Sequence, residues 1–229
     1  MSFTERLIAF ERRLQADMHN IHNPTHLCLG QEQVPQAMSE HLVDGDWVFS
    51  THRAHGHALA AGVDEQKLWD EIHGLDTGLN GGFAGSQGFS DPSRNFHCSA
   101  IVGGLVGVAT GTAMALKLSH SPNIVVCCIG DAGTEQGVWW ESINFAALHG
   151  LPIAYLCENN GKSVDSPILE RQAAQITSRV KAFGLKIGSN VESAMRFARS
   201  GEAAFYEHKC ALACDHLNLS SLLPKLDYA

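Results

Sequence analysis

The chain has 229 residues, of which 45% are hydrophobic and 17% are charged, and its net charge is −8. This length is typical of one large domain, the apolar fraction can fill a buried core, and the composition argues against disorder. Because the charge is negative and no run of Lys or Arg occurs, we expect no nucleic-acid-binding surface.

The sequence shows no pattern typical of export or membrane insertion. The opening residues MSFTERLIAFERRLQ lack the apolar region of a signal peptide, and no apolar run approaches the roughly 20 residues needed to span a membrane. The 7 cysteines show no zinc-binding spacing. We therefore expect a cytoplasmic protein whose cysteines are reduced and lie mostly in the core.

In chain order, the first predicted elements are two helices and a long loop. Residues 3–18 repeat apolar positions at helical spacing, and a second helix is predicted from about Gln31 to Leu42, with Pro35 near its start. The stretch 76–100 is rich in Gly, Ser and Asn, which predicts an irregular loop. Loops this long in a compact domain tend to carry function.

The next segment, IVGGLVGVATGTAMALKL, is predicted to be a helix with an unusual set of glycines. Gly103, Gly107 and Gly111 recur at every fourth position, so they would line one helix face. They cost roughly 2–3 kcal/mol of helix propensity. Close approach of another backbone would offset that cost, and this backbone belongs either to the same chain or to a partner subunit.

Two short β-rich runs with a helical pattern between them predict a strand–helix–strand unit. The strands are NIVVCCI (123–129) and PIAYLC (152–157), and the helix spans 137–149. Such a unit has parallel strands and a right-handed crossover, and ligands gather at the carboxyl ends of its strands. The expected fold is α/β, a three-layer sandwich with a mostly parallel central sheet.

Polar residues follow both predicted strands. GDAGTEQG places Asp131 after the first strand, and CENNGK places Asn159 and Asn160 after the second. A carboxylate, a carboxamide and a nearby backbone carbonyl suit Mg²⁺, and the glycines beside them let the backbone approach phosphate oxygens. In the alternative interpretation, Asp131 caps the helix 137–149 and the Asn pair makes a turn. The spacing alone leaves both interpretations open.

These motifs resemble those of a known enzyme family. GDAGTEQG followed by CENN resembles the thiamine-diphosphate motif. Further stretches resemble the alpha subunit of the first component of 2-oxo acid dehydrogenases of the pyruvate, acetoin and branched-chain types. They follow the family's order, cover about residues 20–185, and read THLCLGQEQ (25–33), HRAHG (52–56), AIVGG (100–104) and WWESINFAALHGLPIAYLCENN (139–160). The resemblance implies that residues 1–229 form a single thiamine-diphosphate-binding domain, the diphosphate and magnesium half, with a short C-terminal segment from about residue 186.

The resemblance assigns residues to the metal and the diphosphate of thiamine diphosphate. Asp131, Asn160 and the backbone carbonyl of Lys162 would bind Mg²⁺. Arg53 in HRAHG would bind the diphosphate, which a bidentate guanidinium suits. His52 stands where the family usually has Tyr; it can hydrogen-bond to phosphate, but here the contact becomes titratable.

Further cofactor contacts are assigned to small residues. Ala100 and Val102 would line the aminopyrimidine ring through backbone groups. Ala132 and Gly133 would lie beside the phosphates, with Ala132 in place of the usual glycine. The added methyl group of Ala132 is expected to be tolerated.

Two histidines are assigned to catalysis. His26 would face the substrate pocket, with a packed histidine as the alternative interpretation. His216 would be an active-site histidine from a late loop whose surroundings match the family poorly. The family's GGSMH appears here as AGSQGF (84–89), so a pocket histidine is missing. This departure leaves the substrate, and whether the chain is catalytically competent, open.

The resemblance implies the alpha subunit of a two-chain enzyme in an α2β2-type assembly. A beta subunit would supply the pyrimidine-binding half and an activating Glu, and the small-molecule substrate would be a 2-oxo acid or a related carbonyl donor, with decarboxylation or acyl transfer. One alternative is a transketolase-like N-terminal subunit that transfers a ketol group. Another is a non-catalytic assembly partner, against which the paired magnesium site argues, because an unpaired buried Asp costs desolvation energy.

Overall fold

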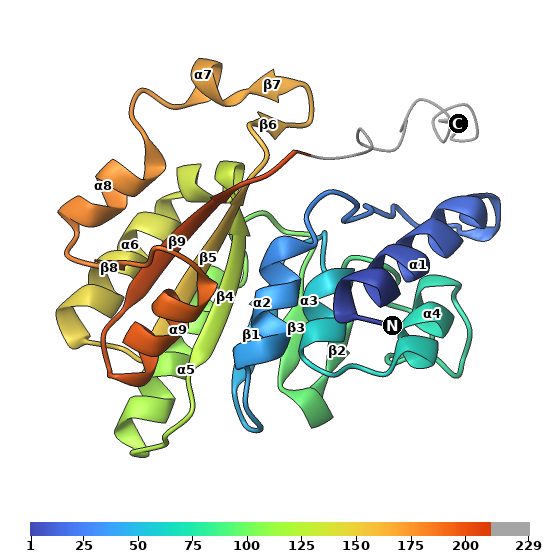
Figure 1. Cartoon of the computed structure of the whole chain (residues 1–229), viewed down its shortest axis with the longest axis horizontal. Helices are drawn as coiled ribbons and strands as arrows, with labels where there is room; N and C mark the ends of the chain where they lie inside the picture. Colours follow the sequence, from blue (N-terminus) through green and yellow to red (C-terminus); the bar gives the residue numbers. More distant parts are fainter. Residues whose placement is uncertain (212–229) are drawn as a thin grey trace, which may run out of the picture.

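The structure, a computed structural model, describes residues 1–211 (Figure 1). The α-helices are α1 (Phe3–Ala16), α2 (Gln33–His41), α3 (His55–Ala60), α4 (Glu65–Ile72), α5 (Val106–Leu118), α6 (Gly137–His149), α7 (Ile168–Arg171), α8 (Ile176–Ala182) and α9 (Val191–Arg199). The short 3-10 helices are η1 (Met18–Asn20), η2 (Pro92–Arg94) and η3 (Asp131–Glu135). The strands are β1 (Trp47–Ser50), β2 (Ser90–Asp91), β3 (Phe96–Cys98), β4 (Val125–Gly130), β5 (Ile153–Asn159), β6 (Lys162–Ser163), β7 (Ser166–Pro167), β8 (Lys186–Ile187) and β9 (Ala204–Lys209).

A seven-stranded sheet forms the centre of the described chain, in the order β2-β3-β1-β4-β5-β9-β8. Neighbouring strands run parallel except at one edge, where β2 runs antiparallel to β3. From β1 the chain moves outward to β3 and then returns to β4 on the other side of β1. The sheet therefore has a topological switch point between β1 and β4, where ligands bind in such sheets.

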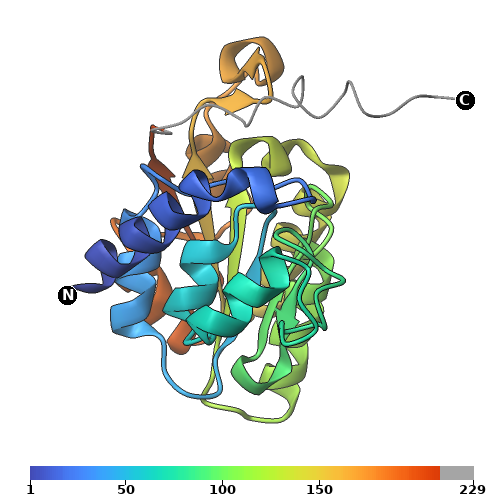
Figure 2. The same ribbon diagram turned by 90° about the vertical axis from the view of Figure 1, so that its right-hand side faces the viewer.

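Both faces of the sheet are covered by helices, because successive side chains of a strand point to opposite faces. Val126 and Cys128 of β4 pack in the cluster formed with α1, α2, α3, α4 and α9. Val125 and Cys127 pack in the cluster formed with α5, α6 and α8. Figure 1 shows α6 and α8 across the sheet from α1 and α4, and Figure 2 shows the N-terminal helices in front of the sheet. The predicted three-layer α/β fold is confirmed.

The predicted helices form where local signals favour them. α1 begins at a capping box, in which the Ser2 hydroxyl accepts from the Glu5 N–H and the Glu5 carboxylate accepts from the Ser2 N–H. α6 spans the predicted residues 137–149 and ends at Gly150, whose left-handed backbone (φ +53°) suits glycine. The strands on either side of α6, β4 and β5, are adjacent and parallel, so the predicted strand–helix–strand unit is confirmed.

The prediction of an irregular loop over 76–100 is partly wrong. Its later part contains β2, η2 and β3, and β3 pairs in parallel with β1. Phe89 and Phe96 are fully buried and stack with ring centroids 5.5 Å apart, so two apolar anchors draw this polar segment into the sheet. The earlier part remains irregular and is held by Glu71, whose buried carboxylate accepts backbone N–H bonds from Asn80, Gly82, Ala84 and Gly85.

The predicted three-glycine helix face is also partly wrong. α5 begins at Val106, so Gly103 lies in the turn before the helix, with φ +75°. Gly107 and Gly111 lie on an exposed part of the helix. A Cβ atom at Gly111 would meet no atom of the described chain within 4 Å. Close approach of a backbone in the same chain therefore does not account for Gly111.

The cysteines of the described chain lie mostly in the core. Those from Cys28 to Cys157 are free and buried, and Cys210 is free and partly buried, in agreement with the predicted core placement.

Within residues 1–211, no helix has both the length and the apolar character needed to cross a bilayer.

Candidate functional site

A pocket of about 270 Å³ lies at the carboxyl ends of β1, β4 and β5. Its position beside the topological switch point follows from the order of the strands. Ten residues assigned from the sequence line it: His26, His52, Arg53, Ala100, Val102, Asp131, Ala132, Gly133, Asn160 and Lys162. His216, the remaining assigned residue, lies outside the described residues. Chain segments far apart in the sequence thus meet in one pocket.

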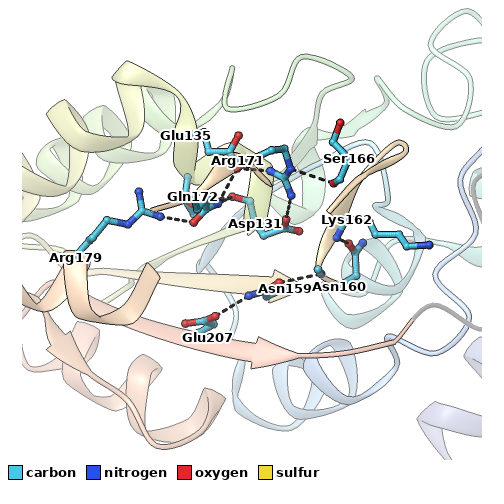
Figure 3. Close-up of polar contacts among 12 residues, drawn as sticks. Asp131, Glu135, Asn159, Asn160, Lys162, Ser166, Arg171, Gln172, Arg179 and Glu207 are labelled. Atoms are coloured by element: carbon cyan, nitrogen blue, oxygen red, sulfur yellow. Dashed lines mark hydrogen bonds and ion pairs between the residues drawn. The ribbon is translucent and has the colours of Figure 1, made fainter. Parts of the chain in front are cut away.

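Asp131 is the first residue of η3 and is 2% exposed. It does not cap α6, because the N-cap residue of that helix is Gln136 and no side chain makes the capping hydrogen bond. Instead, Asp131 Oδ2 lies 2.5 Å from Arg171 Nη2 (Figure 3). Burial raises the pKa of the Asp131 carboxyl, and the hydrogen bond and charge of Arg171 oppose that rise. The capping interpretation of Asp131 is therefore wrong.

The two asparagines at the end of β5, Asn159 and Asn160, do form a turn. Asn159 Oδ1 accepts the Gly161 N–H at 2.9 Å, and Asn160 Oδ1 accepts the Lys162 N–H at 3.0 Å. This geometry is compatible with ligation, since an amide oxygen has two lone pairs. The strand β6, which follows this turn directly, packs against η3, so the turn lies close to Asp131.

The donor set at this edge suits a divalent cation. It combines the Asp131 carboxylate, the Asn160 side-chain oxygen and the Lys162 backbone carbonyl, all of which are oxygen ligands of the kind Mg²⁺ prefers. A cationic group, the Arg171 guanidinium, already lies against the Asp131 carboxylate. The oxygen donors themselves are of the kind that fits a magnesium ion. The described residues contain no cluster of three or more His, Cys, Asp or Glu side chains placed to hold a metal.

Arg53 and two histidines, His26 and His52, form another part of the pocket wall. Arg53 is buried and donates to the carbonyl of Leu27, which fixes its side chain at the start of the segment leading into α3. The rings of His26 and His52 meet edge to face, with centroids 4.8 Å apart. This wall places a guanidinium and two imidazoles around one space.

Gly133 is required by its packing against β4. A Cβ atom there would lie 2.5 Å from the Ile129 side chain. At Gly130 and Gly137, by contrast, a Cβ atom would meet nothing within 4 Å. The absence of a side chain at Gly133 is thus explained by the fold itself.

The pocket contains side chains that the sequence analysis did not assign. Gln87 Nε2 lies 2.8 Å from His26 Nδ1, and Gln87 belongs to the AGSQGF stretch, which departs from the GGSMH of the family. Ser50 and Glu158 also line the pocket, and buried His57 lies between them: Ser50 Oγ lies 2.8 Å from His57 Nδ1, and His57 Nε2 lies 3.1 Å from Glu158 Oε2. The AGSQGF departure was a usable signal for Gln87. For the buried Ser–His–Glu chain the sequence carried no signal.

The sequence model of the dehydrogenase E1 component family matches residues 3–194. The chain is 36% identical over 189 residues to the alpha subunit of acetoin:2,6-dichlorophenolindophenol oxidoreductase of Bacillus subtilis (strain 168), covering 77% of this chain and 57% of that protein. It is 35% identical over 163 residues to the pyruvate dehydrogenase E1 component subunit alpha of Rhizobium meliloti (strain 1021), covering 70% and 47%. The chain spans about half the length of these curated relatives.

Solved structures share the fold. A transketolase from Campylobacter jejuni superposes with a TM-score of 0.71 at 19% identity, covering 92% of this chain and 38% of that one. A putative thiamin diphosphate-dependent enzyme from Mycobacterium smegmatis superposes with a TM-score of 0.53 at 17% identity, covering 80% and 32%. These likenesses concern the fold alone. From its match to the family model and its identity to these alpha subunits, the chain belongs to the dehydrogenase E1 component family.

Proposed function

We propose that this chain is the alpha subunit of a two-chain, thiamine-diphosphate-dependent enzyme that acts on a 2-oxo acid or a related carbonyl donor. The observation that carries the proposal is the single pocket that unites Asp131, Asn160, Lys162 and Arg53. Oxygen ligands for a divalent cation and a guanidinium for phosphate are the groups that a magnesium diphosphate requires. Family membership supports the same reading.

The pocket residues assigned from the sequence have the following proposed roles. Asp131, the Asn160 side chain and the Lys162 carbonyl hold Mg²⁺, and Arg53 and His52 bind the diphosphate. Ala132 and Gly133 border the phosphates, and the backbone of Ala100 and Val102 borders the aminopyrimidine ring. When bound, thiamine diphosphate supplies the capacity to accept the electron pair left on a substrate carbon after bond cleavage.

His26 is proposed to contact the substrate. With the Gln87 amide nitrogen donating to Nδ1, the neutral imidazole carries its proton on Nε2. Such a ring can donate a hydrogen bond to a carbonyl or carboxylate oxygen, which are the polar groups of a 2-oxo acid. Gln87 thereby holds the tautomer and orientation of His26. His216 is proposed to serve the same pocket, as its place in the resemblance implies.

The beta subunit is proposed to pack on α5, α6 and the turn before α5. Large apolar side chains are exposed there, and we call this surface the α5–α6 face: Ile101, Val102, Val108, Leu118, Val138, Phe145 and Leu148. Exposed apolar patches of this kind mark interaction sites. Gly107 and Gly111 of the same helix would let a partner backbone approach closely. We propose an α2β2-type assembly with the cofactor between the two chains, as the resemblance implies.

Two alternatives differ in chemistry. Ketol transfer would use the same diphosphate half, and the likeness to transketolase does not favour it beyond the shared fold. A non-catalytic partner would not need an oxygen donor set and a guanidinium around one pocket. The donor set therefore favours a cofactor-binding subunit.

The proposal is tested by calorimetric titration of thiamine diphosphate with Mg²⁺. The titration is made first into this chain alone and then into its mixture with a candidate beta partner, a protein encoded beside it that carries the pyrimidine-binding half. We expect binding in the mixture and its loss in Asp131→Ala. The matched control is Asp165→Ala, which removes an exposed carboxylate on the β6–β7 hairpin and leaves the pocket lining unchanged. Absence of binding by the wild-type mixture would contradict the proposal.

A further inference from the structure

The proposed metal ligands belong to two separate loops. Asp131 begins the loop after β4, whereas Asn160 and Lys162 belong to the turn after β5. These ligands can bind one cation together only if the two loops stay at a fixed distance from each other. Contacts made by the segment 166–172 join them, as Figure 3 shows.

Arg171 is the centre of these contacts, and all three nitrogens of its guanidinium are used. Nη2 contacts Asp131 Oδ2 at 2.5 Å, Nη1 contacts Glu135, and Nε donates to the Ser166 carbonyl at 3.1 Å. The Arg171 side chain is 14% exposed, so the pair with Asp131 is shielded from water. Charge-assisted bonds from one planar guanidinium to three different acceptors have restricted geometry.

Gln172 adds a second connection to the same loop. Its Nε2 donates to the Asp131 carbonyl at 3.0 Å and to Glu135 Oε1 at 2.8 Å. Its Oε1 accepts a hydrogen bond from Arg179, whose guanidinium lies 4.8 Å from the centre of the Trp140 ring. The segment is therefore fixed to α6 and α8 as well as to η3.

The other end of the segment is joined to the asparagine turn. Lys162 pairs with Pro167 and Ser163 with Ser166 in the β6–β7 hairpin, and the Ile168 N–H donates to the Gly161 carbonyl at 2.8 Å. Because Asn160 and Lys162 lie at the base of this hairpin, Arg171 connects them through the backbone to Asp131. The connection needs no metal.

We propose that Arg171 is a positioning residue that holds the two ligand-bearing loops in register for the divalent cation. This inference rests on the proposed function. The contact uses Oδ2 of Asp131, and the cation would be held through Oδ1. Arg171 with Asp131 and Glu135 keeps one net negative charge, so the cluster still attracts a cation. Groups that orient a metal-binding carboxylate in this way typically change metal affinity by about 10- to 100-fold when removed.

Arg171→Gln tests the inference, with Arg199→Gln as a matched control. Arg199 Nη2 also lies 2.5 Å from a buried carboxylate oxygen, Asp46 Oδ2, but outside the pocket lining. Magnesium affinity is measured by calorimetry at saturating thiamine diphosphate in the mixture with the beta partner. Hydrogen exchange of residues 160–172 is measured in the metal-free chain. Glu135→Gln, which keeps the side-chain size, serves as a second variant should Arg171→Gln fold poorly.

We expect Arg171→Gln to bind Mg²⁺ about 10- to 100-fold more weakly, with turnover at saturating Mg²⁺ reduced far less. Exchange of residues 160–172 should rise in this variant and in Glu135→Gln, and it should match wild type in Arg199→Gln. Wild-type or tighter magnesium affinity in Arg171→Gln, with binding still lost in Asp131→Ala, overturns this inference and leaves the proposed function standing. Failure of the wild-type mixture to bind overturns both.

Discussion

Two buried carboxylates of this chain, Glu71 and Asp131, have their negative charges stabilised by different kinds of partner. Glu71 accepts four backbone N–H bonds, an arrangement that leaves its oxygens saturated. Asp131 is paired instead with a side chain, Arg171, and borders the pocket. The four backbone donors use both oxygens of Glu71, whereas the contact with Arg171 uses Oδ2 of Asp131. Glu71 therefore serves the fold, and Asp131 is the carboxylate that we propose holds the cation.

His97 provides a test of pH dependence at a single residue. Its ring stacks against both Trp47 and Phe49, with centroids 5.9 and 5.5 Å away, and burial lowers its pKa. Because the folded pKa is depressed, the unfolded chain takes up this proton first, and stability is lost as the pH falls below about 6.5. We expect the free energy of unfolding to fall between about pH 7.5 and 5.5, and to fall less in His97→Phe. Urea unfolding at both pH values measures this, and equal decreases in both proteins would contradict it.

At the scale of elements, the order of the segment before β2 depends on one side chain. Glu71 at the end of α4 organises residues 80–85 through their N–H groups. Gly78 packs directly on it, since a Cβ atom there would lie 2.6 Å from Glu71 Cα. The segment carries Gln87, which contacts His26, so Glu71 acts on the pocket through this loop.

Glu71→Gln tests that dependence. An amide group turns one acceptor into a donor that faces other donors, so about 3 kcal/mol of the free energy of unfolding should be lost. Urea unfolding measures the loss, and hydrogen exchange of residues 78–90 should increase. The control is Glu65→Gln on the same helix, where an exposed pair with Arg6 at 3.6 Å should contribute less than about 1 kcal/mol. An equal effect of the two substitutions would contradict the role of Glu71.

At the scale of the whole molecule, the helix layers on the two faces of the sheet differ in how much apolar surface they expose. On one side, the layer of α1, α2, α3, α4 and α9 buries its apolar residues within the chain. On the other side, the α5–α6 face leaves large apolar side chains exposed. Since Val106 and Gly103 at the base of this face also line the pocket, a subunit bound there would close the site.

Val108→Glu tests this face, with Val43→Glu as a control. Val108 is 53% exposed on α5, and Val43 is 54% exposed in the loop between α2 and β1. Both substitutions should change the free energy of unfolding by less than about 0.5 kcal/mol, because both sites are on the surface. Only Val108→Glu should weaken binding to the beta partner, by at least about tenfold, since it would bury a carboxylate without a partner. Calorimetry of the two chains measures this, and unchanged binding would place the interface elsewhere.

The sequence by itself determined the elements with strong local signals. Apolar β-rich runs predict the strands β4 and β5, and a helical pattern predicts the helix between them. The order of these three elements implies that Asp131 and Asn160 meet at one edge of the sheet. The family motifs assigned further residues to the pocket, and those that lie in the described chain do line it. Local pattern was sufficient wherever a feature depends on residues close together in the chain.

The tertiary structure alone decided the features that join distant segments. The entry of β3 into the sheet depends on Phe89 and Phe96 packing in a core assembled from other elements, and the start of α5 at Val106 is not marked by any capping side chain. Arg171 lies 40 positions from Asp131 in an exposed-looking polar segment, so no spacing rule could pair them. Such pairings are set by the path of the chain through space. They become visible only once the sheet has brought the loops together.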